Sequence, residues 1–404
     1  YDTSQASSPC YAKAHAVTMS NPCPAVYVHV PFCRRRCGYC DFHSQVLDPS
    51  RVPTLVDALL AEHEDHTRGG SAEDSLTGGP PLETLYVGGG TPTVLPPAEL
   101  DRLLRGLLSR RRPAPDAEIT VEANPTTVTD EIAGVLAAAG VTRVSIGAQS
   151  FDADELRTLD RDHQPHDVAQ AVTTCRRHGL RHISLDLIFG VPGQTPASWQ
   201  ATLRAAIALE PEHISCYGLT YEPGTPLERR RQAGLVQPLD SDIEATLYEM
   251  AMDILPAAGL HQYEISNFAR PGAECRHNLR YWRNEPVLGI GPAAAGYLDG
   301  VRYKNVADTE GYVRAIQSGG SPRAEVERLP RDRQAGETAV LALRLTAGID
   351  RAVFRERFGD DPAVRYAGIA ARHVADGLLT VDERGIRLTR AGRLVADTVM
   401  ADFV

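Results

Sequence analysis

The stretch Ala25-Val-Tyr-Val-His-Val30, followed by Cys33-Arg-Arg-Arg-Cys37-Gly-Tyr-Cys40, decides how the rest of the chain is interpreted. A short run rich in β-branched residues predicts a buried strand, and the three cysteines follow it on a single loop. Three thiolates at the spacing CxxxCxxC can hold a cubane iron–sulfur cluster and leave one iron without a protein ligand. An open iron of this kind is what a catalytic or ligand-binding metal centre requires.

Zinc is the competing interpretation of these cysteines. A structural zinc ion normally has four protein ligands, and the sequence has no nearby fourth Cys or His at a usual zinc spacing. His43, three residues after Cys40, is the local competitor. We therefore expect Cys33, Cys37 and Cys40 to be the metal ligands and the metal to be a [4Fe–4S] cluster.

A regular alternation of strand and helix patterns extends outward from this loop. It predicts a parallel sheet, and six strand–helix units indicate a partial, TIM-like (β/α)6 barrel, with a doubly wound sheet as the alternative. In both folds the ligand lies at the carboxyl ends of the strands. The expected strands are 25–30, 84–89, 118–124, 143–149, 182–188 and 213–219, and the expected helices lie near 52–60, 97–110, 129–139, 152–160, 167–179 and 198–209.

The last 80 residues have a different pattern, in which helices precede a hairpin. Such an order resembles a small winged-helix-like α+β module, which can bind DNA or serve as a docking cap. The acidic chain favours the cap, and a DNA-binding alternative would use Arg365 and Arg372. The expected helices are 335–346, 350–358 and 362–376, the hairpin lies within 378–389, and before them we expect a helix at 241–258 and a strand at 262–269.

Bulk composition narrows the function further. The 404 residues have a formal net charge of −10, which argues against nucleic acid as a partner because such binding depends on neutralising phosphates. No apolar run reaches the length that spans a bilayer, and no signal peptide is visible. Eight cysteines are too sparse for a disulfide scaffold. We expect a cytoplasmic protein with at most peripheral membrane association.

Domain boundaries follow from these patterns. We expect residues 1–22 to be a disordered N-terminal extension, with Met19 as the natural start, and residues 68–81 to be a flexible insert. The barrel domain with an accessory segment is expected over 23–310. The winged-helix-like domain is expected over 325–404.

The strand and loop from Tyr27 to Phe42 resemble the radical SAM superfamily. Within it they resemble the branch of oxygen-independent coproporphyrinogen III oxidases and the heme chaperones related to them. The resemblance extends from about residue 25 to the C-terminus, and the last module resembles the HemN C-terminal type. It implies that the open iron binds the amino and carboxylate groups of S-adenosylmethionine (SAM).

The same resemblance implies which residues contact SAM. Gly88-Gly-Gly-Thr-Pro92 matches the glycine-rich segment of the family, where glycines let the backbone approach a ligand closely. A barrel-interior ion pair is the alternative for Glu122, and a surface charge is the alternative for Arg161. The implied contacts are Tyr27, Tyr39, Gly89, Gly90, Thr91, Glu122, Gln149, Arg161 and Asp186.

Two segments distinguish the branches. Oxidases resemble CxxxCxxCxC, whereas this chain has Phe42 at the last position, as the chaperones do. His277-Asn-Leu-Arg-Tyr-Trp282 matches the HNxxYW motif of the chaperones. Imidazole can ligate heme iron, and aromatic rings can stack on a porphyrin, so His277, Tyr281 and Trp282 are heme-binding candidates. A histidine hydrogen-bonded beside the barrel is the other interpretation of His277.

The resemblance therefore implies a heme chaperone that delivers heme to apo-hemoproteins of the respiratory chain. The cluster and SAM would act in regulation, dimerisation or transfer, and a homodimer is one expected state. The rival is a coproporphyrinogen III dehydrogenase, which decarboxylates propionates to vinyl groups. A third interpretation is a winged-helix regulator with a redox cluster.

Overall fold

A computed structural model of the protein describes residues 23–67 and 81–404. The expectations for the N-terminal extension, for Met19 and for nearly all of the insert at 68–81 fall outside these residues. No helix within the described ranges is long and apolar enough to cross a membrane.

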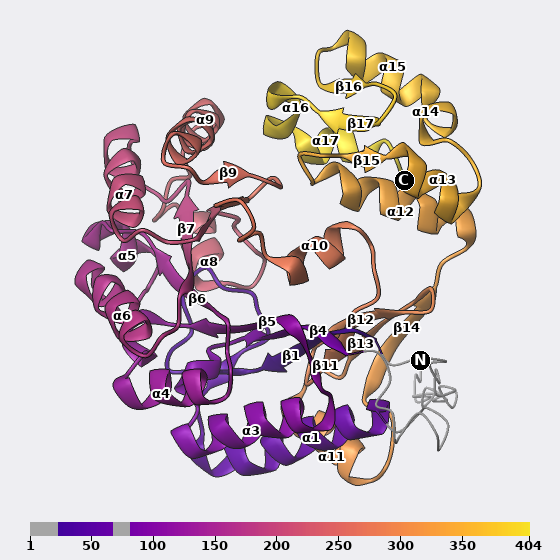
Figure 1. Ribbon diagram of the computed structural model, residues 1–404. Coiled ribbons are helices and arrows are strands. Elements are labelled where there is room, and N and C mark those ends of the chain that lie inside the picture. The colour runs from indigo at the N-terminus through magenta and orange to yellow at the C-terminus, as the bar shows by residue number, and fades with distance from the viewer. Residues whose placement is uncertain (1–22, 68–80) are drawn as a thin grey trace, which may run out of the picture.

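Six parallel strands form the centre of the molecule and pair in the order in which they occur along the chain. A doubly wound sheet reverses its strand order part-way, and this run does not, so the partial (β/α)6 barrel is confirmed. Helices cover the outside of the sheet (Figure 1). The strands are β1 (Ala25–Val30), β4 (Leu82–Gly89), β5 (Pro113–Ala123), β6 (Arg143–Gln149), β7 (His182–Phe189) and β8 (His213–Gly218).

The helices between and after these strands lie close to their expected positions, and several have polar N-caps. Thr129 caps α4 and Thr195 caps α7 through side-chain bonds to backbone amides. They are α1 (Val52–Thr67), α3 (Pro97–Arg110), α4 (Asp130–Ala138), α5 (Ala153–Thr158), α6 (Pro165–Arg177), α7 (Pro196–Ala208), α8 (Pro226–Gln232) and α9 (Ser241–Ala257).

The barrel is open, because its two edge strands are not paired with each other in the described part of the chain. Strand β11 (Leu288–Ile290) adds in parallel to β1, whereas β10 (Asn267–Ala269) is antiparallel to β8 and is followed by β9 (His261–Gln262). The single strand expected at 262–269 is therefore wrong. The buried carboxylate of Glu264 accepts bonds from the Ser266 amide and the Asn267 side chain, which stabilises a turn between the two short strands.

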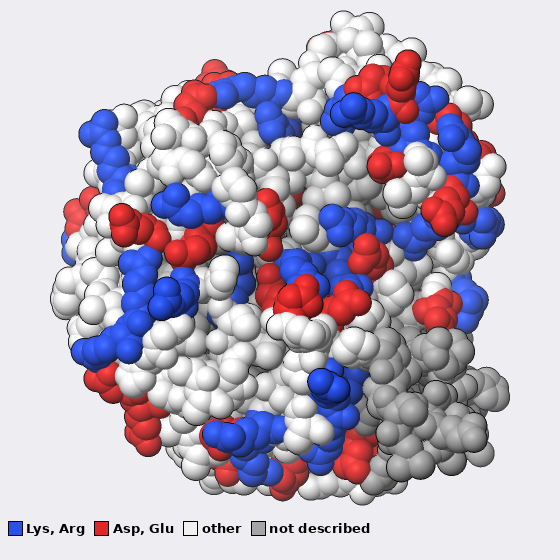
Figure 2. All heavy atoms as spheres, viewed as in Figure 1, with Lys and Arg blue, Asp and Glu red and all other residues white. Residues whose placement is uncertain are grey.

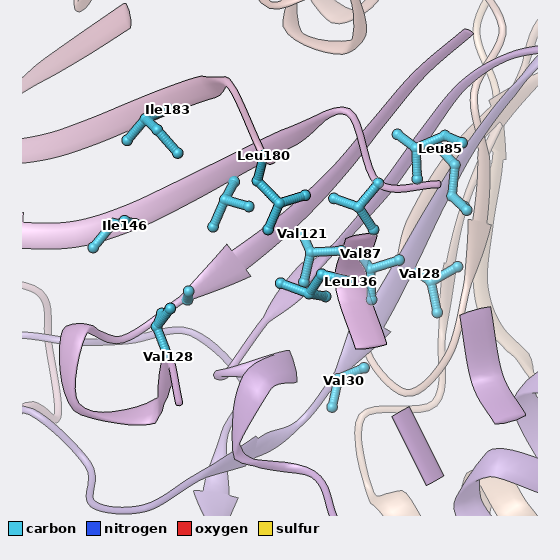
Figure 3. Packing of buried hydrophobic residues seen from close by; sticks show 14 of the residues in the cluster. Val28, Val30, Leu85, Val87, Val121, Val128, Leu136, Ile146, Leu180 and Ile183 are labelled. Atoms are coloured by element: carbon cyan, nitrogen blue, oxygen red, sulfur yellow. The ribbon is translucent and has the colours of Figure 1, made fainter. Parts of the chain in front are cut away.

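Alternate residues of each barrel strand face outward and form the main apolar core. Figure 3 shows Val28, Val87, Val121, Leu136 and Ile146 in this cluster, and all five are almost fully buried. Burying one side chain of this size contributes about 1.5–3 kcal/mol relative to leaving it exposed. Because side chains alternate along a strand, the residues between them point into the barrel.

The C-terminal region has a second core of its own, which includes Phe354, Phe358, Ile386 and Phe403. The expected helices and hairpin are present, although the third helix divides at Tyr366. A short strand pairs with the hairpin, and two further helices end the chain. The elements are α12 (Arg331–Leu343), β15 (Ile349–Asp350), α13 (Arg351–Phe358), α14 (Pro362–Arg365), α15 (Ala367–Ala375), β16 (Leu379–Val381), β17 (Gly385–Leu388), α16 (Arg390–Leu394) and α17 (Ala396–Ala401).

The two arginines that a DNA-binding module would use are paired with acids. Arg365 bonds to Asp360, and Arg372 bonds to Asp402. In Figure 2 blue and red side chains alternate over this upper region. A recognition face for phosphates needs cations that are free to meet them, so the winged-helix regulator gains no support from this surface.

A connecting segment links the barrel to the C-terminal region along the chain. It contains α10 (Arg276–Trp282), a three-stranded sheet and α11 (Thr309–Gln317). The strands of this sheet are β12 (Ala295–Leu298), β13 (Val301–Asn305) and β14 (Arg323–Arg328).

Candidate cofactor site

A cavity of about 410 Å³ opens at the carboxyl ends of the barrel strands. This is the size range of small-molecule sites and the expected place for a ligand in a barrel of this kind. Most of the predicted site residues line it together: Cys33, Cys37, Cys40, Tyr39, Gly89, Gly90, Thr91, Glu122, Gln149, Arg161 and Asp186. Tyr27, His277, Tyr281 and Trp282 lie outside its lining.

The cysteine loop is tied down at both ends. Strand β2 (Phe32–Cys33) pairs with β3 (Gln45–Val46) and so closes the loop. The Thr91 hydroxyl donates to the Cys33 sulfur at 3.6 Å. Burial raises the pKa of Cys33 and raises that of Cys40 to about 11. Thiols in this state are protonated, so iron binding must release their protons.

The three thiols suit a cluster better than a single ion. In the described ranges, no three side chains of His, Cys, Asp or Glu gather as ligands of one metal ion. A cubane offers a different iron to each thiolate, so its ligands need not converge on one point. His43, the zinc competitor, uses its backbone carbonyl to accept a bond from the His29 Nε2–H at 2.8 Å.

Close packing against other parts of the protein requires glycine at positions 88–90. A Cβ atom at Gly90 would lie 2.5 Å from the Phe32 carbonyl oxygen, and one at Gly88 would lie 2.7 Å from the Glu122 carboxyl carbon. Gly89 has φ +106°, a backbone conformation that side chains disfavour. These glycines therefore let the end of β4 approach the cysteine loop and Glu122, which is a close approach between parts of the protein itself.

Glu122 is held by two neutral donors. The Tyr86 hydroxyl donates to one carboxylate oxygen at 2.8 Å, and the Gly89 amide donates to the other at 2.9 Å. Burial, with a smaller contribution from the nearby Asp186, raises the pKa of Glu122 to about 7. Neither hydrogen-bond partner is a cation, so these contacts do not support the barrel ion pair as the role of Glu122.

Asp186 forms the opposite acidic wall of the cavity. Its carboxylate accepts bonds from the hydroxyls of Ser145 and Ser215, at about 3 Å. Burial raises its pKa. Two carboxylates with spare acceptor capacity can receive ammonium or hydroxyl groups of a ligand.

Gln149 and Arg161 are positioned together. Gln149 has φ +63°, a rare conformation for a residue with a side chain, and such strain often marks functional sites. Arg161 donates to the Gly147 carbonyl at 2.6 Å and to the Cys37 sulfur at 3.2 Å. Because Arg161 lines the cavity and contacts the Cys37 sulfur, its interpretation as a surface charge is wrong.

Several cavity residues were missed by the motif-based prediction. Those on strands share the inward-facing register of the predicted residues: Ser145 is paired with Glu122 and Ser215 with Asp186 across strands, and the other inward positions follow at two-residue intervals. This period is the signal that finds them. The missed strand residues include Tyr86, Arg143, Ser145, Ser184, His213, Ser215 and Tyr217, whereas Cys275 and Asn278 line the cavity from the start of α10, where this period does not apply.

Tyr27 lies outside the cavity lining and contacts it indirectly, through His29. The His29 Nε2–H donates to a carbonyl, so its Nδ1 must accept from the Tyr27 hydroxyl, 3.0 Å away. The carbonyl belongs to His43, just beyond the cysteine loop. Tyr27 therefore supports the imidazole that holds this loop, and its direct contact with SAM stays a prediction.

The histidine of the HNLRYW segment is buried. His277 is 1% exposed in α10, and its Nδ1 lies 2.9 Å from the Thr84 hydroxyl. Its ring stacks on Tyr86 with centroids 5.2 Å apart. The Glu118 carboxylate accepts the amides of Arg276 and His277, which fixes the start of the helix. Burial lowers the pKa of His277 to about 3, so the imidazole is neutral.

The other end of α10 connects to the C-terminal region. The Arg344 guanidinium lies 4.3 Å from the centre of the Trp282 ring, and the Asn284 side chain donates to the Thr338 hydroxyl at 3.0 Å. Arg357 donates to the Asn284 carbonyl. These contacts agree with a histidine hydrogen-bonded beside the barrel. Heme contact by His277, Tyr281 or Trp282 stays a prediction, and the His277 imidazole can meet iron only if α10 moves.

Comparison with known proteins agrees with this architecture. The family model described as the radical SAM superfamily matches residues 27–206, and that of the HemN C-terminal domain matches residues 329–395. Coproporphyrinogen III oxidase (HemN) from Escherichia coli superposes with a TM-score of 0.82 at 23% identity. It covers 96% of this chain and 91% of its own, which shows a shared fold.

Curated relatives are more similar in sequence. The heme chaperone HemW of Bacillus subtilis is 35% identical over 381 residues, covering 94% of this chain and 99% of its own. HemW of Mycobacterium tuberculosis is 38% identical over 377 residues, covering 93% of each chain. Nearly full-length similarity at this level means that the chain belongs to the radical SAM superfamily, in the branch of HemN-like proteins that includes HemW.

Proposed function

We propose that this protein is a heme chaperone, which binds heme and hands it to apo-hemoproteins of the respiratory chain. The observation that carries the proposal is its similarity to proteins named heme chaperone HemW along almost their whole length. Phe42 supports it, because this side chain is 62% exposed at the cavity where the oxidase pattern has a further cysteine. The expected setting is the cytoplasm, with at most peripheral membrane association.

The cavity residues fit a [4Fe–4S] cluster and SAM. Cys33, Cys37 and Cys40 supply the thiolates, and the carboxylates of Glu122 and Asp186 face the same space. When bound, the cluster supplies an electron and an open iron for the amino and carboxylate groups of SAM. The chain's own task is to orient that ligand and to exclude water. We propose that SAM tunes heme binding, transfer or dimerisation.

The rival function is oxidative decarboxylation of coproporphyrinogen III. The fold shared with HemN favours it, although a likeness at 23% identity concerns the fold alone. The two functions differ in product: a dehydrogenase releases carbon dioxide and leaves vinyl groups, whereas a chaperone returns unaltered heme. Anaerobic incubation of the reconstituted protein with coproporphyrinogen III, SAM and a reductant, followed by porphyrin analysis, separates them.

Heme titration under anaerobic conditions tests the proposal. The cluster-reconstituted protein is titrated with heme, with and without SAM, and absorbance is followed in the Soret region. We expect saturable binding at a fixed ratio of heme to protein. No saturable binding by the wild type would rule out the chaperone.

Two variants extend this titration. His277→Ala removes the predicted heme-binding imidazole, and His63→Ala removes another buried histidine, from α1, as a matched control. Weaker binding in His277→Ala alone supports a heme site at α10. Equal binding in all three proteins places the heme elsewhere and leaves the function standing.

A further inference from the structure

Tyr86 lies between the predicted SAM site and the HNLRYW segment. Its hydroxyl donates to Glu122 at 2.8 Å, and its ring stacks on His277 at an interplanar angle of 29°. The side chain thus contacts the cavity at its hydroxyl end and α10 through its ring face. The Tyr86 ring therefore links α10 to Glu122.

Several contacts hold the His277 imidazole in its position against Tyr86. Thr84, two residues before Tyr86 on β4, lies 2.9 Å from the imidazole Nδ1 and is itself buried. The Tyr281 ring packs edge-on against the same imidazole at 5.3 Å. The α10 amides are fixed by Glu118 from β5. A buried ring with a hydrogen bond and three aromatic neighbours, of which Tyr27 is the third, has one preferred position.

The hydrogen bonding of the Glu122 carboxylate depends heavily on Tyr86. Its two donors are the Tyr86 hydroxyl and the Gly89 amide. A hydrogen bond to an ionised group contributes more than a neutral one, because it offsets the desolvation of the charge. Removing the hydroxyl leaves the carboxylate with a single donor and makes its charged form less favourable.

We infer that Tyr86 is a positioning residue for Glu122 and that His277 holds Tyr86 in place, so that His277 acts on the SAM site through Tyr86, in addition to Asn278 of the same segment, which lines the cavity directly. This inference rests on the proposed SAM site. It gives His277 a role that does not require contact with heme.

Other charges around Glu122 set the pH range in which this contact matters. Asp186 on β7 disfavours its ionised form, and Glu122 itself raises the pKa values of Tyr27 and Tyr217. The Tyr86 hydroxyl opposes these effects by stabilising the carboxylate. Losing it shifts the ionisation of Glu122 to higher pH.

SAM affinity across pH 6–9 tests the inference. The probe is radiolabelled SAM in anaerobic equilibrium dialysis with the cluster-reconstituted full chain. In the wild type we expect affinity to fall below about pH 7, as Glu122 becomes protonated. Tyr86→Phe keeps the ring and loses the hydroxyl, so it should weaken binding about tenfold near neutral pH. It should also move the midpoint of the pH profile upward.

Substitutions of His277 separate stacking from metal ligation. His277→Ala removes the ring behind Tyr86 and should weaken SAM binding, whereas His277→Phe restores an aromatic ring and should recover most of it. Arg276→Ala is the control in the same helix, because its side chain pairs with the exposed Asp116 at the surface. This control should bind SAM like the wild type.

The outcomes are distinct. Equal affinities and pH midpoints for wild type and Tyr86→Phe would overturn the inference and leave the SAM site standing. Failure of His277→Phe to recover the affinity lost in His277→Ala would overturn the role of stacking. If the wild type binds no SAM, the proposed cofactor site itself fails.

Discussion

The cysteine loop and α10 are both short segments with a family motif, yet the structure surrounds them differently. Cys33, Cys37 and Cys40 are half-buried around an open cavity, and their sulfurs have few protein partners. His277 is buried, hydrogen-bonded and stacked. The thiols thus face a space that a ligand can fill, whereas the His277 imidazole is packed against protein rings and, in the described part of the chain, only its Nε2 lacks a hydrogen-bond partner.

This difference shows that a sequence motif identifies residues but does not show which of them contact a ligand. Thiol spacing is dictated by the metal, so the cysteine motif carries its chemistry in its spacing. The spacing in HNLRYW is that of one helical face, and a helix can present such a face to the protein as readily as to a ligand. The predictions below test this division, from the largest expected effect to the smallest.

Removal of one loop cysteine should have the largest effect. In Cys37→Ala we expect complete loss of the visible absorbance of the reconstituted cluster, because a cubane with two protein thiolates is not retained. Cys175→Ala, in the apolar core, is the control and should reconstitute normally. Equal iron and sulfide content in both variants would contradict the prediction that Cys37 is a ligand of the cluster.

Glu122→Gln should change how stability depends on pH. Burial raises the folded pKa of Glu122 to about 7 from an ordinary 4.5. Its contribution to folding is therefore complete below about pH 4.5 and is lost as pH rises through about 7. The variant, without SAM or metal, should gain about 3 kcal/mol over the wild type between pH 4.5 and pH 8.

Urea unfolding of both proteins at the two pH values measures this gain. Gln keeps a carbonyl for one donor, and the Tyr86 hydroxyl can turn to accept from the Gln amide. A constant difference between wild type and variant across this pH range would show that Glu122 does not titrate as a buried carboxylate.

Arg344→Ala tests the connection between α10 and the C-terminal region. The substitution removes the cation over Trp282 and the partner of the fully buried Glu264 carboxylate. We expect a loss of about 2 kcal/mol in unfolding free energy. Thermal unfolding should show whether this loss appears in the C-terminal region first. An unchanged melting profile would mean that the Arg344 contacts do not stabilise the connection between α10 and the C-terminal region.

The smallest effect is expected at an ion pair on the surface of α3. Arg105 and Asp101 are one helical turn apart; Arg105 is exposed to solvent and Asp101 is half-buried. Arg105→Ala should cost less than about 0.5 kcal/mol, and added salt should reduce that cost. If Arg105→Ala lowers the unfolding free energy as much as Arg344→Ala does, the loss in Arg344→Ala does not come from its contacts between α10 and the C-terminal region.

The sequence predicts the barrel well because its strands are short, β-branched and regularly spaced. The predicted runs at 143–149 and 25–30 coincide with β6 and β1. The segment at 262–269 is also β-branched and aromatic, but Glu264 turns the chain there by accepting two local bonds. Local composition does not reveal such a bond.

The site is only partly predictable. Glu122 and Asp186 stand out as acids in apolar strands, and both line the cavity. Tyr86 looks like an ordinary strand residue, because its importance comes from a neighbour almost 200 positions away. The burial of His277 depends on that same long-range packing, which its motif does not reveal.

The rate of heme transfer tests the central claim most directly. Heme-loaded protein is mixed with the apo form of a respiratory b-type hemoprotein, and the Soret change is followed at increasing acceptor concentration. A chaperone that hands heme over in a complex predicts a rate that rises with acceptor concentration and exceeds the rate from heme-loaded serum albumin. A rate independent of acceptor, set by passive release, would contradict the account.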